Sequence, residues 1–348
     1  MKSMSGFGGG VASLSMAGAG GAMNEWTPSN MPNAPTNVDI SIMSGYPNIL
    51  QIYYPTTVSL TSSSNTTNND SSHIVLSNFD FTPYGSTSVT FYGIGAGGGG
   101  SIGPCGNGSG GGGSAFKIVV PAGNIRLSNV TLRTGRRGRG GHQSTPRGQT
   151  SSSPWGVASG AYGGGQTSVT FNDGSSIYAG GGRSGNTDGC ASQQPGGMGN
   201  EQGGTGGSTG NISFATSSQT WDGGNGYRGG HDGHAGGNAA FPGGYISGVP
   251  TAGAVGQNGS PGTSGSQGRY GEGGKGCTVL SNAGAVGGSN TSDKFGPINE
   301  TITGCKLLSG ISNGFGGGGG NAETDGGLNT YSGYGGHGGM GAIFIELN

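Results

Sequence analysis

The stretch from Gly253 to Gly276 reads GAVGQNGSPGTSGSQGRYGEGGKG and carries glycine at every third position from 253 to 274. Neither an α-helix nor a β-strand has a period of three residues, whereas a left-handed helix of the polyproline II type does. Glycine along one row of such a helix exposes bare backbone, whose N–H and C=O groups can bond to neighbouring segments. The stretch therefore predicts polyglycine II structure.

Shorter runs with the same spacing occur at Gly223–Gly229 and at Gly333–Gly339. A collagen triple helix also has glycine at every third position, but it requires proline or hydroxyproline at about 15–20% or more. Within the long stretch only Pro261 is present. The pattern therefore favours polyglycine II helices that pack side by side through their glycine rows.

The composition indicates how such a chain becomes ordered. The sequence has 348 residues and 88 glycines, with 29% hydrophobic and 8% charged residues. A chain this poor in apolar side chains cannot build a large conventional core, so we expect its order to come from backbone hydrogen bonds, because buried unpaired N–H and C=O groups are costly. The fold class predicted is all-β with polyglycine II: short antiparallel strands framing a glycine-rich bundle of left-handed helices, with almost no α-helix.

Charge and hydropathy limit the partners that we expect. The net charge is −1, which favours neither nucleic acid nor an acidic membrane surface. No run of 18 apolar residues is present, so no membrane-spanning helix is expected. The N-terminus lacks a long apolar run, and we expect no secretory signal.

Three regions follow from the distribution of glycine. Residues 1–36 are predicted to be a flexible or docking arm with Trp26 as its anchor, and residues 37–85 a small β attachment region. Residues 86–348 are predicted to be the glycine-rich β and polyglycine II domain. Alternating or apolar runs predict strands at 38–42, 48–60 with a break at Pro55, 73–81, from 88 into the glycines, 114–120, 125–133, 168–171, 176–179, 211–214, 277–280 and 341–348.

The order of these parts resembles a known family. The matching stretches are GAGGGG (95–100) after a strand, GGGGSAFKIVVPAG (110–123), GQTSVTFNDGSSIYAGGG (165–182) and GGHGGMGAIFIELN (335–348). Over residues 86–348 the chain is similar to the glycine-rich domain of phage tail-fibre and adhesin proteins and of virion proteins of large DNA viruses.

The resemblance implies a non-enzymatic virion protein: a tail fibre, an adhesin, or a minor capsid or fibre component. In phage adhesins of this kind, polyglycine II layers form a rigid body and variable loops at its tip bind the bacterial surface. The partners implied are other virion proteins, further copies of the chain, and a glycan or protein receptor on the host. The location implied is the virion, assembled in the host cytoplasm, or otherwise the extracellular space.

Aromatic residues in glycine-rich surroundings are the candidates for ligand contact, because sugar faces stack on aromatic rings. Five residues combine rings with polar or charged groups and are predicted to contact a surface or a glycan: Trp221, Tyr227, Arg228, His231 and Tyr245. The competing interpretation, which we favour, is that the rings pack at the ends of the bundle and fill what little core it has.

Other chemistry receives little support from the sequence. Five arginines between Arg133 and Arg147 resemble an RGG segment, but without repeats or interleaved aromatic residues a solvated loop or a subunit or glycan contact is favoured. His231, Asp232 and His234 lack an obvious third ligand, so no metal is predicted. GxGxxG patterns occur without a βαβ unit, and we expect neither an enzyme nor a cofactor.

The four cysteines and the glycosylation motifs leave alternatives open. Three disulfide pairings are compatible with four cysteines, which are Cys105, Cys190, Cys277 and Cys305. Free thiols are the default for a protein assembled in the cytosol. Asn-X-Ser/Thr motifs are abundant in a chain this rich in these residues, so they carry little weight.

Two further structural roles compete with the virion interpretation. Polyglycine II bundles include antifreeze proteins with flat faces of small residues, but Gln257, Arg269 and Tyr270 break such a face here. An extracellular matrix protein would show simpler glycine repeats and a signal peptide, neither of which is present in this sequence.

Overall fold

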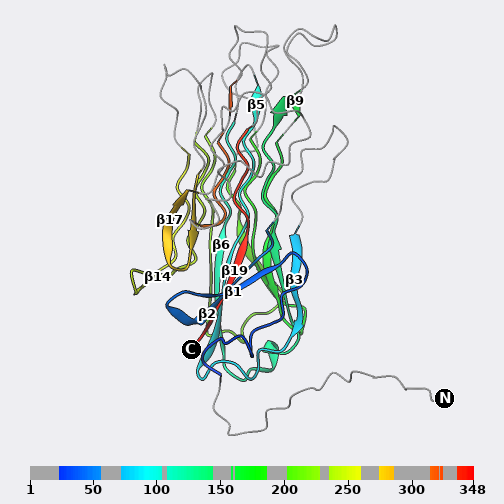
Figure 1. Cartoon of the computed structure of the whole chain (residues 1–348), viewed down its shortest axis with the longest axis vertical. Helices are drawn as coiled ribbons and strands as arrows, with labels where there is room; N and C mark the ends of the chain where they lie inside the picture. Colours follow the sequence, from blue (N-terminus) through cyan, green and yellow to red (C-terminus); the bar gives the residue numbers. More distant parts are fainter. Residues whose placement is uncertain are drawn as a thin grey trace, which may run out of the picture.

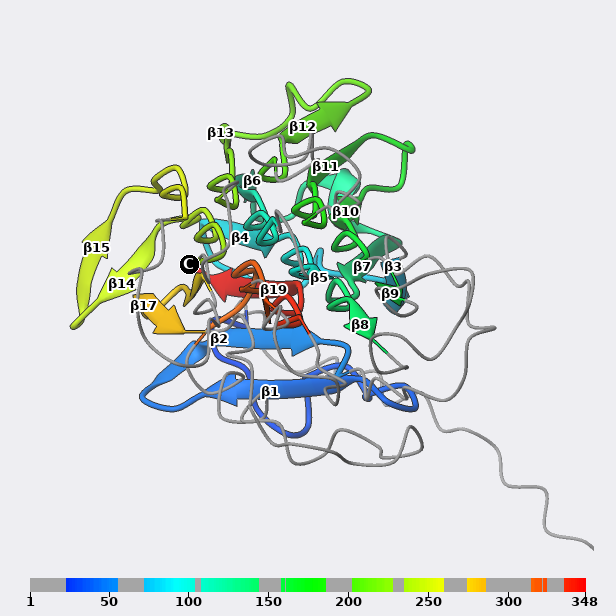
Figure 2. The same ribbon diagram turned by 90° about the horizontal axis from the view of Figure 1, so that it is seen from above.

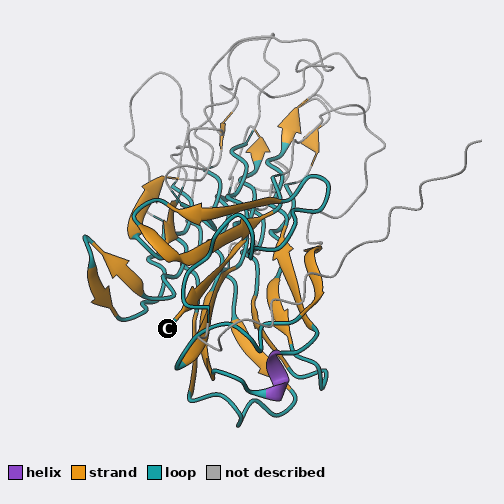
Figure 3. Cartoon of the chain, turned by 60° about the horizontal axis from the view of Figure 1, so that its bottom comes forward, coloured by secondary structure: helices purple, strands orange, loops and turns teal. Residues whose placement is uncertain are grey.

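The computed structural model describes residues 23–55, 72–103, 108–143, 158–159, 161–185, 202–227, 235–259, 274–285, 314–320, 322–323 and 335–348. These residues form two parts (Figure 1): a β-sandwich, called the base, and a set of extended glycine-rich segments above it, called the bundle. Several strands of the base continue directly into bundle segments. The strands are orange and the bundle segments teal in Figure 3, where a single purple turn marks the one short helix of the described chain.

The larger sheet of the base has six strands and is antiparallel throughout. It contains strands from both ends of the chain, in the order β1 (Asp39–Met43), β2 (Tyr46–Tyr53), β19 (Ala342–Leu347), β4 (Ser88–Ile94), β6 (Ala115–Pro121) and β13 (Ser217–Trp221). Residues 37–85, predicted as a separate attachment region, thus share this sheet with strands from the glycine-rich region. The glycine content changes near residue 85, but both sheets combine strands from before and after this point.

The second sheet has five strands and is also antiparallel. Its order is β12 (Gly206–Thr209), β11 (Ser176–Ala179), β10 (Thr167–Thr170), β7 (Val130–Gly135) and β3 (Ser72–Phe79). Four two-stranded pairs complete the described strands: β14 (Gly244–Ile246) with β15 (Val249–Thr251), β16 (Lys275–Thr278) with β17 (Ser281–Ala285), β8 (His142–Gln143) with β9 (Ala158–Ser159), and β5 (Ile102–Gly103) with β18 (Ala322–Glu323).

Apolar side chains hold the base together on both faces of the six-stranded sheet. Alternate residues of its strands, such as Phe91 and Ile345, point into the core between the two sheets. The intervening residues, such as Tyr92 and Phe344, point to the other face, where they form a second cluster with Phe315 and other residues. Both faces are therefore buried over much of the sheet, as the apolar run AIFIEL of β19 anticipates.

The N-terminal end of the described chain is fastened to the base by Trp26. Its side chain is 2% exposed and stacks on Tyr84, with ring centroids 4.9 Å apart. Its Nε1–H donates to the carbonyl oxygen of Ile345 in β19 at 3.2 Å. The expectation that Trp26 acts as an anchor is confirmed, and what it anchors to is the chain's own sandwich.

Backbone hydrogen bonds in the bundle follow a period of three. Successive N–H groups of residues 95–101 donate in rotation to three neighbouring segments, with N···O distances from 2.8 to 3.1 Å. The first, fourth and seventh reach 108–114, the second and fifth reach 162–165, and the third and sixth reach 336–339. A strand would instead direct its bonds to two sides in alternation.

The carbonyl groups of the same segment bond to three other segments. Those of residues 96–100 accept from 138–141, from 182–185 and from Gly319. Three donor directions and three acceptor directions give this segment six hydrogen-bonded neighbours. Residues 109–114 repeat the rotation, donating in turn to 224–227, 316–319 and 180–183. Viewed from above, the segments appear end-on as small coils lying side by side (Figure 2).

Close packing explains why glycine occupies the interior of the bundle. A Cβ atom added to Gly97 would come closer than 3.0 Å to the carbonyl group of Gly317, and one added to Gly113 would meet that of Gly95 in the same way. Real Cβ atoms essentially never show such separations. The glycine content is therefore set by the distance between neighbouring backbones.

The described part of the opening stretch, residues 253–259, lies on the outside of the bundle. Gly253, Gly256 and Gly259 are half-buried, whereas the four residues between them are exposed. The N–H groups of Gly256 and Gly259 donate inward to the carbonyls of Asp222 and Asn225. The glycine row thus faces the neighbouring segment, as its spacing predicts; residues 260–273 lie outside the described residues.

Most predicted strands are confirmed and several details differ. The strand predicted at 277–280 runs instead from Lys275 to Thr278, and residues 56–60 of the stretch predicted at 48–60 lie outside the described residues. The segment predicted as a strand at 125–133 begins with a 3₁₀ turn, η1 (Ile125–Leu127), because Asn124 caps it by accepting from the N–H of Arg126. The strand predicted at 211–214 is wrong: the Asn211 side chain accepts from the N–H of Ser213 at 2.9 Å and bends the chain there. The strands that were not anticipated have two to five residues each and little apolar alternation: β5, β8, β9, β12, β13, β14, β15, β17 and β18.

Candidate functional site

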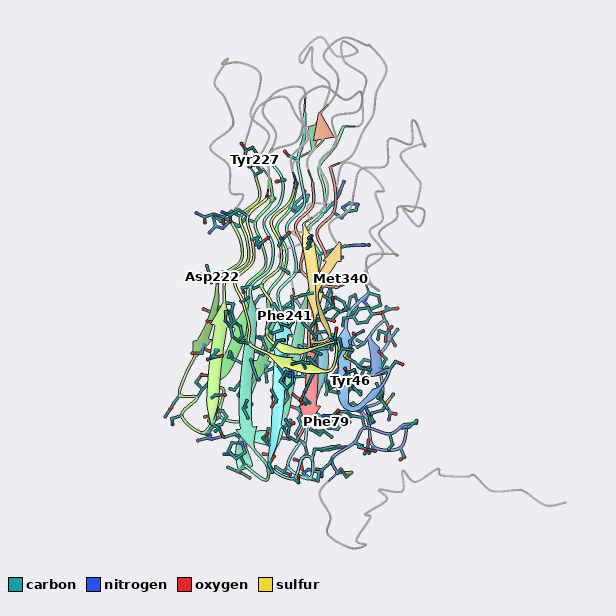
Figure 4. All side chains as sticks on the ribbon, turned by 90° about the vertical axis from the view of Figure 1, so that its left-hand side faces the viewer. Tyr46, Phe79, Asp222, Tyr227, Phe241 and Met340 are labelled. Carbon is teal, nitrogen blue, oxygen red and sulfur yellow. The ribbon has the colours of Figure 1, made fainter. Side chains whose placement is uncertain are left out.

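The predicted contact residues lie in different places. Trp221 ends β13, Tyr245 lies in β14, and Tyr227 lies near the upper end of the bundle segment 222–227, above Asp222 (Figure 4). Arg228 and His231 lie outside the described residues. No single cluster therefore unites the three described candidates.

Tyr245 belongs to a hydrogen-bonded group on the outer face of the six-stranded sheet. Its hydroxyl donates to Oε1 of Glu346 at 2.5 Å, and the hydroxyl of Tyr92 donates to Oε2 at 2.5 Å. Glu346 is only 3% exposed, so these two donors satisfy a buried carboxylate. The hydrogen bond to Glu346, together with burial, raises the pKa of Tyr245 to about 12. This geometry makes Tyr245 a packing residue that fastens β14 to β19.

Trp221 packs against Gly253, the first residue of the stretch with glycine at every third position. In the register of the sheet it lies beside Ala115 of β6. A Cβ atom added to Gly253 would overlap the indole ring. The ring is half-buried, so it covers the lower end of residues 253–259 and keeps part of its surface exposed.

Polar side chains line one flank of the bundle. Its amide-bearing residues were not among the predicted contact residues. Three adjacent outer segments form this flank, which we call the amide flank: residues 202–206, 222–227 and 253–259. Their exposed positions carry mainly amides and small polar groups, with one carboxylate: Gln202, Thr205, Asp222, Asn225, Ala254, Val255, Gln257 and Asn258.

Side-chain oxygens on this flank take the place of backbone carbonyls. Oδ1 of Asn225 accepts from the N–H of Gly203 at 2.8 Å, and Oδ1 of Asn258 accepts from the N–H of Asn225 at 2.9 Å. Oδ1 of Asp222 accepts from the N–H of Gly206 at 3.3 Å. Each oxygen satisfies an N–H group at the edge of the bundle. The spacing of Asp222 and Asn225 by three residues is the sequence signal that could have revealed this arrangement.

Tyr227 is held by its backbone. Its N–H donates to Oγ of Ser109 at 2.7 Å, and its carbonyl accepts from the N–H of Ser109 at 3.1 Å. The segment carrying Trp221, Asn225 and Tyr227 is therefore fixed to the interior of the bundle at its upper end.

The arginine-rich stretch is not the solvated loop that was expected, at least over residues 133–143. Residues 136–141 form a bundle segment in which Arg137 is 9% and Arg139 is 7% exposed. The Arg139 guanidinium lies 5.9 Å from the centroid of the Tyr162 ring. Arg147 lies outside the described residues.

A histidine lies beside these arginines inside the bundle. Nδ1 of His337 accepts from the N–H of Gly140 at 2.7 Å, again in place of a backbone carbonyl. Burial, together with the positive charges of Arg137 and Arg139, lowers the pKa of His337 to about 3. His337 is therefore neutral at physiological pH and acts as a hydrogen-bond acceptor within the bundle.

The remaining candidate chemistry is sparse in the described part of the chain. No group of three or more His, Cys, Asp and Glu side chains among the described residues is arranged to hold a metal ion. Cys277 is a buried free thiol that donates to the carbonyl of Ala240 at 3.0 Å, and burial raises its pKa. The other three cysteines and the His231–His234 stretch lie outside the described residues.

No protein-family model matches the chain, and no curated protein matches its sequence. The described residues include no helix with the length and apolar character needed to cross a membrane.

Proposed function

We propose that the chain is a non-enzymatic structural protein of a virion, serving as a tail fibre, an adhesin or a minor capsid component. The base joins it to the particle, with other virion proteins or further copies of the chain as partners. The bundle presents its distal end to a host surface or to neighbouring subunits. The mechanism is rigid presentation, without a catalytic residue or cofactor.

We infer that the bundle segments are left-handed polyglycine II helices. Support comes from the rotation of hydrogen bonds among three donor directions, because this helix has three residues per turn. The half-buried glycines of residues 253–259, alternating with pairs of exposed residues, fit the same period.

The observation that carries the proposal is the six-fold hydrogen-bonding of residues 95–101. A segment tied to six neighbours cannot bend or slide without breaking many bonds at once, so the bundle acts as a stiff support. Its segments run away from the base (Figure 1), and the segments that end at residues 143, 185 and 227 continue into residues 144–157, 186–201 and 228–234.

The resemblance to glycine-rich virion domains is the reason for assigning this stiff support to a virus particle. In those proteins, loops at the end of a polyglycine II body contact the host surface. At the base, the N–H of Gly85 donates to the carbonyl of Met23, and the N–H groups of residues 86–88 donate to the carbonyl of Asn348. Met23, where the described part of the predicted docking arm (residues 1–36) begins, thus lies on the side of the molecule opposite the distal ends.

Immunogold labelling of intact particles from the source tests the proposal. An antibody against residues 144–157 should label particles, at fibre tips for an adhesin and across the shell for a minor capsid protein. Particles that carry no label, in a preparation whose other virion proteins are detected, would overturn the virion assignment.

A further inference from the structure

We propose that the amide flank binds a linear, neutral glycan through the side-chain amides of Asn225 and Asn258. The inference rests on the proposed attachment function and extends it, because it names a ligand class and assigns binding to the side of the bundle in addition to its distal end.

The first step concerns the orientation of the two amides. Oδ1 of each asparagine is already bonded to a backbone N–H, from Gly203 in one case and from Asn225 itself in the other. To cap a backbone N–H group, a side chain needs only an acceptor oxygen, and the carboxylate of Asp222 caps the N–H of Gly206 in this way. An asparagine in the same role also carries an NH₂ group with two donors. Since the oxygen is held and the residue is exposed, the NH₂ group of each asparagine can donate to a ligand.

The second step concerns spacing. Asp222 and Asn225 are three residues apart on one segment, which corresponds to about 9 Å along a helix that rises about 3.1 Å per residue. Asn258 lies beside Asn225 on the neighbouring segment. Polar groups therefore repeat along the axis on a rigid surface, and a linear polysaccharide presents hydroxyl and ring oxygens at regular intervals along its own axis.

The third step concerns apolar contact. Trp221 is half-buried at the lower end of the flank, where it packs against Gly253, and Val255, two residues further along that segment, is 67% exposed. Trp combines a large apolar surface with a polar N–H group. The C–H face of one sugar ring can pack against Trp221, while later sugars of the same linear chain reach the amides above.

Charge argues against other ligands. Among the exposed residues of the amide flank, the only formal charge is the carboxylate of Asp222. Binding of phosphate or nucleic acid depends on Lys and Arg, which these positions lack. A ligand rich in neutral hydroxyl groups matches the donors and acceptors present.

The same hydrogen bonds argue against a second copy of the bundle as the occupant. A further glycine segment would need free N–H groups along the edge to which its carbonyls could bond. On this flank the N–H groups of Gly203, Gly206 and Asn225 already bond to side-chain oxygens. At these three positions the flank is therefore closed to lateral addition of backbone, whereas a ligand that bonds to side chains can still bind there.

Affinity gel electrophoresis of the full chain tests the inference with named polysaccharides: a β-glucan, a mannan and a soluble chitin derivative as neutral probes, and heparin as the anionic probe. The test variant is Asn225→Asp with Asn258→Asp, which keeps both capping oxygens and replaces the outward NH₂ donors. The control is Asn124→Asp with Asn211→Asp in the base, where both side-chain oxygens likewise accept from backbone N–H groups. Both variants change the net charge by the same amount.

We expect at least one neutral polysaccharide to retard the wild-type chain and the control equally, and the test variant to bind it at least tenfold more weakly with an unchanged thermal unfolding midpoint. Absence of retardation by every neutral probe, retardation by heparin alone, or equal losses in the test and control variants would each overturn the inference. Such a failure leaves the particle-labelling result untouched, so the two proposals are separable.

Discussion

The base and the bundle are built from the same chain segments but are stabilised by different groups. β4 runs into residues 95–101, so one continuous segment belongs to a sheet in its first half and to the bundle in its second. In the base, side chains such as Phe91 and Ile345 fill the space between two sheets. In the bundle, the backbones approach so closely that Gly97 has no room for a Cβ atom.

This difference between side-chain packing and backbone packing determines which substitutions each part tolerates. A packed apolar core accepts side chains of similar volume at small cost, since neighbouring groups can adjust. A backbone held by hydrogen bonds on six sides has no flexible atom that can move away. We therefore expect a small change in side-chain volume to lower the stability of the bundle strongly and that of the base only slightly.

The largest effect is predicted for alanine in the interior of the bundle. Gly97→Ala would place a methyl group against the carbonyl of Gly317 and force two segments apart. We expect a loss of at least about 4 kcal/mol in the free energy of unfolding, a size reserved for severe packing defects. Urea denaturation of soluble protein measures it. Gly123→Ala is the matched control: it lies in a turn of the base with φ +69° and nothing within 4 Å of a new Cβ, and should cost about 1 kcal/mol.

A smaller but still large effect is predicted for a core residue of the base. Phe91 is fully buried between the two sheets and contacts Phe81 edge-on. Phe91→Ala should cost about 3–4 kcal/mol, whereas Phe91→Leu should cost less than half of that. Denaturant titration of both variants measures the ratio. If leucine were as damaging as alanine, the view that the base tolerates similar volumes would be wrong.

The stability of the folded chain should decrease at acidic pH because the bundle contains a buried neutral histidine. His337 has its pKa lowered from 6.5 to about 3, so the unfolded chain takes up a proton at a pH where the folded chain does not. Its contribution is complete above about pH 6.5 and is lost as the pH falls toward 3, which amounts to about 2 kcal/mol between pH 7 and pH 5.

His337→Asn separates this effect from the titration of other groups. Asparagine keeps an acceptor near the N–H of Gly140 and does not titrate, while Arg137 and Arg139 are unchanged. The difference in unfolding free energy between wild type and variant should therefore shrink or reverse on going from pH 7 to pH 5. A difference that stays constant over this range would show that folding does not lower the pKa of His337.

The smallest effect is predicted at the edge of the bundle. Asn225→Ala removes the oxygen that caps the N–H of Gly203 and should cost about 1 kcal/mol, the usual contribution of one such hydrogen bond. Asn225→Asp keeps the oxygen and should cost clearly less. Thermal unfolding of the two variants compares them; equal losses would contradict the capping role.

Sequence patterns predicted the strands with apolar alternation or apolar runs, among them β1, β4 and β19, because burial of a sheet face requires apolar residues at regular positions along the strand. The glycine spacing likewise predicted that Gly253, Gly256 and Gly259 face inward. What could not be predicted was the partner of each segment, since glycine rows are chemically alike and carry no register. That information lies in contacts such as the one between Gly95 and Ser114.

The candidate site was predicted less well, for a physical reason. Aromatic and charged residues are easily recognised in any sequence and were the predicted contact residues, but one of them, Tyr245, satisfies a buried carboxylate. The amides of Asn225 and Asn258 became notable only when their oxygens were seen to replace backbone carbonyls. In a chain with many asparagines, nothing in composition distinguishes these two.

Native-state hydrogen exchange tests the central claim most directly, because it reads individual backbone N–H groups. If the bundle is held by hydrogen bonds in three directions, every N–H from Gly95 to Ser101 should be protected, to a level close to that of the buried strand β4. If these N–H groups exchanged at the rate of unstructured peptide while β4 remained protected, the account of a bundle ordered by its backbone would be contradicted.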